Sequence, residues 1–125
     1  MNEKTAAKNF QRFIRLRDAF DGGNCISCGK YIQWDKGCDA GHYISRRHKV
    51  SLFDEANCHA QCKYCNDYLH GNLLEYRKYL IRKIGLEKVE ALEDNKNTIV
   101  QRKGFHYIAL NEYYLKKCRD IKAGK

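Results

Sequence analysis

With 125 residues, 43% of them hydrophobic, the chain is long enough to bury one modest core and too apolar to be a disordered tail. Its 24 Lys and Arg against 15 Asp and Glu give a formal charge of +9, which favours a polyanionic partner, with nucleic acid ahead of acidic membrane surfaces. No stretch approaches the roughly 18 apolar residues of a membrane span, and charges throughout the N-terminal region argue against a secretory signal. We therefore expect one cytoplasmic domain with no membrane partner.

The first predicted element is a basic amphipathic helix over residues 3–20. Apolar side chains recur at three- and four-residue steps from Ala6 to Phe20, and lysines and arginines fill the positions between them. Gly22 and Gly23 are expected to end this helix, because glycine tolerates the left-handed backbone of a helix C-terminus.

Two Cys-x2-Cys pairs lie in the next region, residues 25–72, which lacks helical periodicity and is expected to hold a knuckle, a short hairpin and loops. An x2 spacing lets both sulfurs of a pair face one ion at Zn–S distances of roughly 2.3 Å. An odd total of seven cysteines without an export signal favours a metal over disulfides. The sequence therefore predicts a structural zinc site with the ligands Cys25, Cys28, Cys62 and Cys65.

Three further cysteines have no x2 partner. Cys118 falls on the apolar stripe of the last predicted helix and is expected in the core. Cys38 and Cys58 are either spare thiols, which we favour, or rival zinc ligands.

The region 73–121 is predicted to be helical. One apolar stripe runs from Leu73 to Ile84 and ends at Gly85, a shorter helix follows over residues 86–92, and residues 95–98 form a turn or linker. A final helix is expected from about Phe105 to Asp120. The chain has no proline and no internal repeat.

Polar motifs run between and after the cysteine pairs: Asp39-Ala-Gly-His42, Asn57-Cys-His59-Ala-Gln61 and Gly71-Asn72-Leu73. Together with the cysteine pairs, these motifs resemble the lambdoid phage NinG (Rap) recombination nuclease family, which is similar to the HNH, or ββα-metal, endonucleases. The resemblance extends from about Phe10 through the last helix. It implies an α+β fold in which a zinc-stabilised ββα-metal (HNH-like) core has flanking N-terminal and C-terminal helices.

The resemblance also implies an activity, that of a metal-dependent, structure-selective DNA endonuclease of phage or prophage recombination in the host cytoplasm. Branched or single-stranded DNA, such as Holliday junctions and D-loops, is the expected substrate. His42 is expected to activate water as a general base, and Asn57 to brace the hairpin through side-chain to backbone hydrogen bonds. A catalytic Mg²⁺ or Mn²⁺ is expected on oxygen ligands from Asp39 and Asn66.

Three assignments stay open at the level of sequence. Many HNH nucleases place a metal-binding Asp or His directly before the base, where this chain has Gly41, so Asp39 is either a ligand or a structural acid at a strand end. His70 lies four residues after Asn66 and, on one helix, either shares the ion, contacts a phosphate or is a surface histidine. His59 shares a strand face with Asn57 and either contacts the phosphate or metal or packs in the core.

Basic side chains around these motifs are expected to bind DNA phosphates, and no element resembles a major-groove recognition helix. A homodimer is expected because resolving a two-fold junction needs two cuts, and phage recombination proteins are candidate partners. Two alternatives remain: an HNH nuclease of broad duplex specificity, and a non-catalytic zinc-finger DNA-binding protein. The predicted DNA contacts are Arg12, Arg15, Arg46, Arg47, Lys49 and Lys63.

Overall fold

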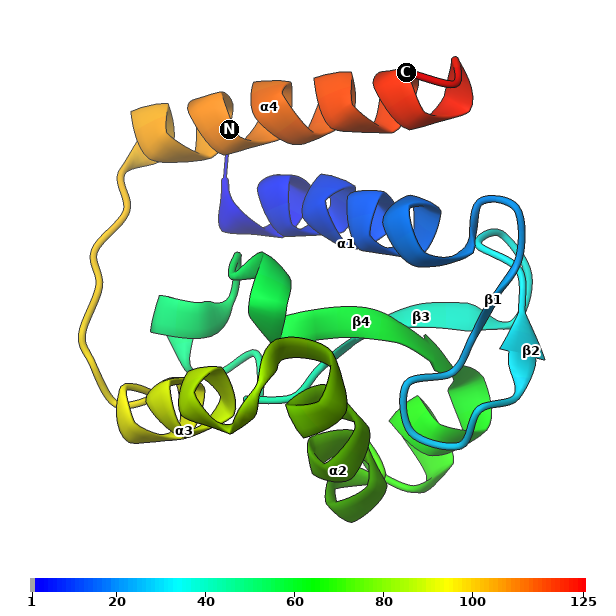
Figure 1. The fold of residues 1–125 in the computed structure, drawn as a ribbon. Coiled ribbons are helices and arrows are strands. Elements are labelled where there is room, and N and C mark those ends of the chain that lie inside the picture. Colours follow the sequence, from blue (N-terminus) through cyan, green and yellow to red (C-terminus); the bar gives the residue numbers. More distant parts are fainter. Residues whose placement is uncertain (1) are drawn as a thin grey trace.

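Helices lie on both sides of a central β-hairpin in the computed structural model, which describes residues 2–125 (Figure 1). Two 3₁₀ turns, η1 (Lys49–Ser51) and η2 (Glu55–Asn57), precede the second hairpin strand, and one π-helical turn, η3 (Tyr64–Tyr68), follows it. The fold is α+β, as predicted from the sequence. The helices and strands are α1 (Glu3–Ala19), β1 (Gly23–Asn24), β2 (Tyr31–Ile32), β3 (Cys38–His42), β4 (Cys58–Cys62), α2 (Leu73–Ile84), α3 (Leu86–Asp94) and α4 (Gly104–Lys122).

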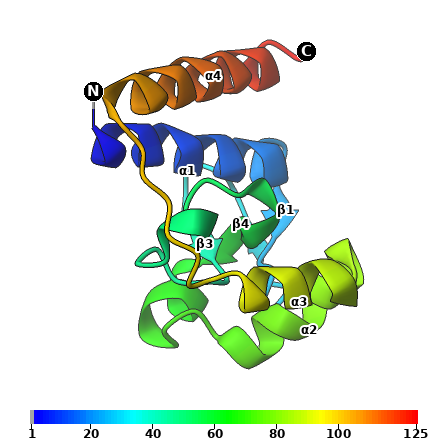
Figure 2. The same cartoon turned by 90° about the vertical axis from the view of Figure 1, so that its left-hand side faces the viewer.

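Helix α1 forms where the apolar periodicity predicts it and packs between the hairpin and α4 (Figures 1 and 2). The Asn2 side chain caps it by accepting a hydrogen bond from the Thr5 N–H at 3.0 Å. Phe10 is fully buried and meets Tyr114 of α4 edge to face, with ring centroids 5.0 Å apart. Helices α1 and α4 run parallel. This is possible because, after a turn at residues 95–97, residues 98–103 cross the side of the molecule (Figure 1).

The hairpin of β3 and β4 is antiparallel, in a register that pairs Cys38 with Cys62 and His42 with Cys58. Helix α1 covers the edge of β4 that faces away from β3, because Arg17 donates to the Cys58 carbonyl at 2.7 Å and Asp18 accepts from the Ala60 N–H at 2.8 Å. These bonds satisfy an otherwise open strand edge. The outer edge of β3 is left beside the cleft described below.

Helices α2 and α3 pack on the other side of the hairpin through the fully buried Tyr76, Leu80 and Val89. The Tyr76 hydroxyl donates to the Gly41 carbonyl at 2.6 Å, which ties α2 to β3. The predicted helices over residues 73–84 and 86–92 are thus present, the second of them extending to Asp94. No helix within residues 2–125 is long and apolar enough to cross a membrane.

Candidate metal centre and adjoining cleft

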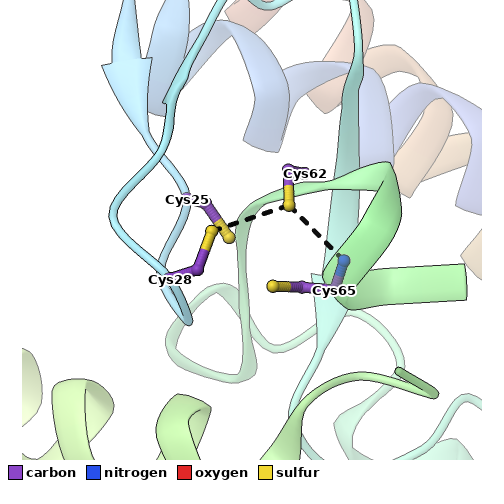
Figure 3. Close-up of side chains that lie close together, drawn as sticks. All are labelled: Cys25, Cys28, Cys62 and Cys65. Atoms are coloured by element: carbon purple, nitrogen blue, oxygen red, sulfur yellow. Dashed lines mark hydrogen bonds between the residues drawn. The ribbon is translucent and has the colours of Figure 1, made fainter. Parts of the chain in front are cut away.

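Four cysteine sulfurs converge where the β1–β2 loop meets the start of η3. Their Sγ atoms all lie within 4.8 Å of one another (Figure 3). Cys28 Sγ and Cys62 Sγ are 3.8 Å apart, and a tetrahedral ion with Zn–S bonds of roughly 2.3 Å places its sulfurs at about this separation. The donor set and its spacing therefore fit a zinc ion. The cluster consists of the predicted residues Cys25, Cys28, Cys62 and Cys65.

Local hydrogen bonds hold the sulfurs in place. The Cys65 N–H donates to Cys62 Sγ at 3.4 Å. The Asn72 side-chain amide donates to Cys65 Sγ, also at 3.4 Å. Burial raises the pKa of the Cys65 thiol to about 12, so a thiolate is unfavourable there unless a cation compensates it. Bound zinc would supply that compensation and tie the β1–β2 loop to the end of β4.

The remaining cysteines lie outside this cluster. This agrees with the interpretation of Cys38 and Cys58 as spare thiols, and Cys118 lies in the core as expected. Cys38, Cys58 and Cys118 are buried, and none belongs to the metal-binding group. Burial raises the pKa of Cys38 to about 11 and that of Cys58 further still. These thiols are therefore neutral and inert at physiological pH.

A cleft of about 710 Å³ runs along the outer edge of β3, between α1 and η3. Its lining mixes acidic, amide, imidazole and basic side chains, including Asp39, His42 and Asn66. The cysteine cluster positions turn η3, which forms one side of this cleft, because Cys62 and Cys65 flank the start of the turn that carries Asn66.

Asp39 and Asn66 meet across the cleft. The Asn66 Nδ2 donates to Asp39 Oδ2 at 3.0 Å, and Lys63 Nζ pairs with Asp39 Oδ1 at 2.6 Å. The Asp39 carboxylate raises the pKa of Lys63. Strand β3 and turn η3 thus bring together the carboxylate and amide that the resemblance implies as ligands of a hard cation, with an ammonium beside them.

His42 lines the same cleft at the end of β3, and its ring is oriented by the backbone. Its Nε2 lies 3.0 Å from the Leu52 carbonyl oxygen, which can only accept, so Nε2 carries the proton. Nδ1 therefore keeps its lone pair, with the Cys58 sulfur 3.7 Å away. Burial lowers the pKa of His42, opposed by the bond to Leu52 and assisted by Arg46, so the ring is neutral near pH 7.

Asn57 braces the loop between the strands. Its side chain is fully buried, accepts from the Ile44 N–H at 2.8 Å and donates to the Ile44 carbonyl at 3.0 Å. A third bond, at 3.3 Å, reaches the Ser51 carbonyl. These are side-chain to backbone bonds of the kind expected from the sequence, and they fix the loop that carries the Leu52 carbonyl.

A family model described as "Bacteriophage Lambda NinG protein" matches residues 2–124. The chain belongs to the NinG family. Protein ninG of Escherichia phage lambda is 39% identical over 126 residues, covering 95% of this chain and 56% of that protein. Protein ninG of Escherichia phage 933W is 39% identical over 123 residues, covering 96% of this chain and 52% of that protein.

This NinG-family chain spans about half the length of the curated relatives it matches. No solved structure matches it.

Two histidines of the NinG-family chain differ from their expected placement. His59 is only 3% exposed, does not line the cleft and packs edge-on against Tyr76, which favours the core alternative over a phosphate or metal contact. The prediction that it shares a strand face with Asn57 is wrong, because Asn57 ends a 3₁₀ turn. His70 does line the cleft but does not share a helix with Asn66, since η3 ends at Tyr68 and His70 has a left-handed backbone with φ of 51°.

Gly41 occupies the position where many HNH nucleases carry a metal ligand. It is absent from the cleft lining, although Ala40 and His42 on either side are present. A Cβ at Gly41 would come within 2.1 Å of the Gln61 side-chain oxygen. A side chain at this position would therefore meet Gln61, and Asp39 is the acidic residue of β3 that lines the cleft.

Five of the six predicted DNA contacts line one of two adjoining hollows. Arg15, Arg46 and Lys63 line the cleft, whereas Arg47 and Lys49 border a second hollow that shares Arg46 with it. Lys49 also pairs with Glu3, with 2.6 Å between Nζ and Oε1. Arg12 lines neither space.

Asp67 and the backbone partner of His42 were not expected from the sequence. Asp67 lines the cleft and lies four residues after Lys63 on one turn, a spacing that could have indicated it. The Leu52 carbonyl is a backbone group that meets His42 only through the folded loop, so no side-chain pattern signals it.

Proposed function

We propose that this chain is a divalent-metal-dependent DNA endonuclease with its active site in the cleft. The observation that carries the proposal is His42: a neutral imidazole, oriented by a carbonyl, in the same cleft as the paired Asp39 and Asn66. The order of the elements also supports an HNH-like assignment. A strand carries the base, a second strand returns, and a helical turn carries the amide.

In the proposed reaction, His42 Nδ1 gives up its contact with the Cys58 sulfur and accepts a proton from the water that attacks phosphorus. The Leu52 carbonyl keeps the proton on Nε2 and stabilises the imidazolium that forms. Asp39 and Asn66 would hold Mg²⁺ or Mn²⁺, which supplies positive charge against the phosphate and the leaving 3′ oxygen. The expected products carry 5′-phosphate and 3′-hydroxyl ends.

Lys63 gives the cleft a way to respond to DNA. Its ion pair with Asp39 is exposed, and exposed pairs contribute only about 0–1 kcal/mol, so the ammonium can leave for a phosphate at little cost. Asp39 is then free for the cation. Arg15 and Arg46 lie along the same cleft and would follow the DNA backbone.

A branched substrate is the finer part of the proposal. It is supported by the resemblance to recombination nucleases and by the second basic hollow, which meets the cleft at Arg46. Two adjoining basic hollows suit two DNA segments that diverge. A dimer would supply the two cuts that resolve a symmetric junction.

Cleavage assays on matched variants test this function. Zinc-loaded wild type is expected to cut a labelled four-way junction with Mg²⁺ or Mn²⁺ faster than the linear arms of that junction. His42→Ala should lower the rate by about 10²–10⁴-fold, whereas His106→Ala, an exposed histidine outside the cleft, should not. Activity in zinc-loaded, folded His42→Ala overturns the assignment of the base. Equal rates on junction and arms remove the branched-DNA claim.

A non-catalytic zinc-dependent DNA-binding protein is the second candidate. Within residues 2–125, only the four cysteines form a group of three or more His, Cys, Asp or Glu side chains with donor atoms within 4.8 Å. The Lys63 ammonium also already pairs with the Asp39 carboxylate. Wild type that binds the junction tightly but never cuts it with either ion would favour this candidate.

A further inference from the structure

The turn η3 presents three kinds of side chain in three directions. Cys65 points inward to the zinc cluster. Asn66 and Asp67 line the cleft, as does Lys63 just before the turn. Tyr64 and Tyr68 belong to neither group.

Tyr64 and Tyr68 form an exposed aromatic pair. Their rings are stacked, with centroids 5.1 Å apart and planes inclined by 16°. Tyr64 is 58% exposed and Tyr68 is 72% exposed. Neither hydroxyl has a hydrogen-bond partner within residues 2–125, and neither ring packs in a core cluster of that part of the chain. The chain therefore exposes two parallel rings that its own fold does not cover.

The surroundings of the pair indicate what would cover it. Tyr64 directly follows Lys63 in the sequence, and Tyr68 directly follows Asp67. Each tyrosine is therefore the sequence neighbour of a residue that lines the cleft. That cleft also holds Arg15 and Arg46, and the chain carries a net charge of +9. A ligand that offers a flat aromatic face next to a phosphate matches both features, and nucleotides have this chemistry.

We propose that Tyr64 and Tyr68 form a stacking platform for an unpaired base of DNA whose phosphates lie in the adjoining cleft. This inference rests on the proposed function and specifies which DNA the site prefers. The bases of an intact duplex are covered by their neighbours, whereas a base at a branch point, gap or single-stranded end has a free face. The platform therefore gives selectivity for unpaired nucleotides without reading their sequence.

Zinc would make the platform rigid. Tyr64 and Tyr68 are the first and last residues of η3, Cys65 lies within that turn, and Cys62 ends the strand before it. A preformed ring pair loses little side-chain freedom when a base stacks on it, so more of the stacking energy contributes to binding.

Fluorescence measurements on the full, zinc-loaded chain test the platform without added Mg²⁺ or Mn²⁺. The probe is a duplex with one unpaired 2-aminopurine at a gap, whose emission falls when the base stacks. At saturating protein, wild type and Tyr64→Phe/Tyr68→Phe should quench the emission, and Tyr64→Ala/Tyr68→Ala should not. Tyr113→Ala removes a 49%-exposed ring on α4 and serves as the control that quenches normally.

Affinity provides the second measurement. The double alanine variant should bind the gapped duplex about 5- to 150-fold more weakly, the range expected for losing one stacked base, while its affinity for intact duplex stays within about twofold. Zinc content and circular dichroism must match wild type, and single Ala variants replace the double variant where they do not. Equal quenching by the alanine variants, or an equal loss of affinity for intact duplex, overturns the platform.

The platform and the nuclease can fail separately. Tyrosine-dependent quenching by a protein that never cuts DNA supports the platform and rejects the proposed function. Normal cleavage of branched DNA by the double alanine variant, with unchanged quenching, rejects the platform alone. A shift from dimer to monomer in that variant, without a change in quenching, would assign the ring pair to a second copy of the chain and also reject the platform.

Discussion

Replacing Asn57 by alanine tests the loop that orients the candidate base. The variant removes the partners of the buried Ile44 N–H and carbonyl, which are 2.8 Å and 3.0 Å from the Asn57 side chain. A buried polar group left without a partner costs about 1–3 kcal/mol, so the two groups predict a loss of about 2–6 kcal/mol in the free energy of unfolding. Such a loss is a large share of the roughly 5–15 kcal/mol that stabilises a typical domain.

Urea denaturation of zinc-loaded protein, followed by circular dichroism, measures this loss. Asn97→Ala is the matched control, because Asn97 is exposed in the linker and should change the free energy by less than about 0.5 kcal/mol. The Asn57 variant should also cleave DNA more slowly, since Leu52 lies in the loop that Asn57 braces. A loss below about 1 kcal/mol at matched zinc content would refute the reasoning.

Three further predictions concern the metal, the buried histidine and the glycine of β3. Cys65→Ser should lose stoichiometric zinc and the folded circular dichroism spectrum, because structural zinc contributes on the order of 10–16 kcal/mol of binding free energy in model peptides. The control Cys38→Ser should keep both. Elemental analysis measures the zinc content, and zinc retention by Cys65→Ser would contradict the site. Burial lowers the pKa of His59 to about 3, so below about pH 6.5 the unfolded state binds a proton that the folded state does not. The free energy of unfolding should therefore decrease as the pH is lowered, by up to about 1.4 kcal/mol per pH unit. His59→Leu should flatten that slope in pH-dependent urea melts, and an identical slope would show that the histidine is not buried and neutral. Gly41→Asp should destabilise the protein and leave the cation affinity unimproved, because its Cβ would meet Gln61; tighter Mn²⁺ binding in this variant would contradict the assigned geometry.

Local patterns were sufficient for part of this structure. The x2 spacing predicted the four cysteines that converge in the candidate metal centre, because each pair acts within a few residues. Apolar periodicity predicted the helices of residues 3–20 and 105–120. The parallel arrangement of α1 and α4 was not predictable in this way, since it depends on the long extended linker between α3 and α4.

The arrangement of side chains in the cleft could not be predicted from the sequence. The pairing of Asp39 with Asn66 depends on the register of the hairpin and on the placement of η3, both of which arise from tertiary packing. The placement of His59 is not predictable from strand alternation, because Asn57 ends a 3₁₀ turn and β4 begins at Cys58. The face of β4 that carries His59 packs against Tyr76 of α2. His70 does not lie on a helix with Asn66, because η3 ends two residues earlier, at Tyr68.

A crystal structure of the zinc-loaded protein soaked with Mn²⁺ at a concentration that supports cleavage, read by anomalous scattering, tests whether the cleft binds the catalytic ion. A manganese peak is expected on oxygens of Asp39 and Asn66, in the cleft that His42 lines, with Lys63 displaced from the carboxylate. A cleft without manganese, with Lys63 still on Asp39 while the protein cuts DNA under the same conditions, would contradict this expectation.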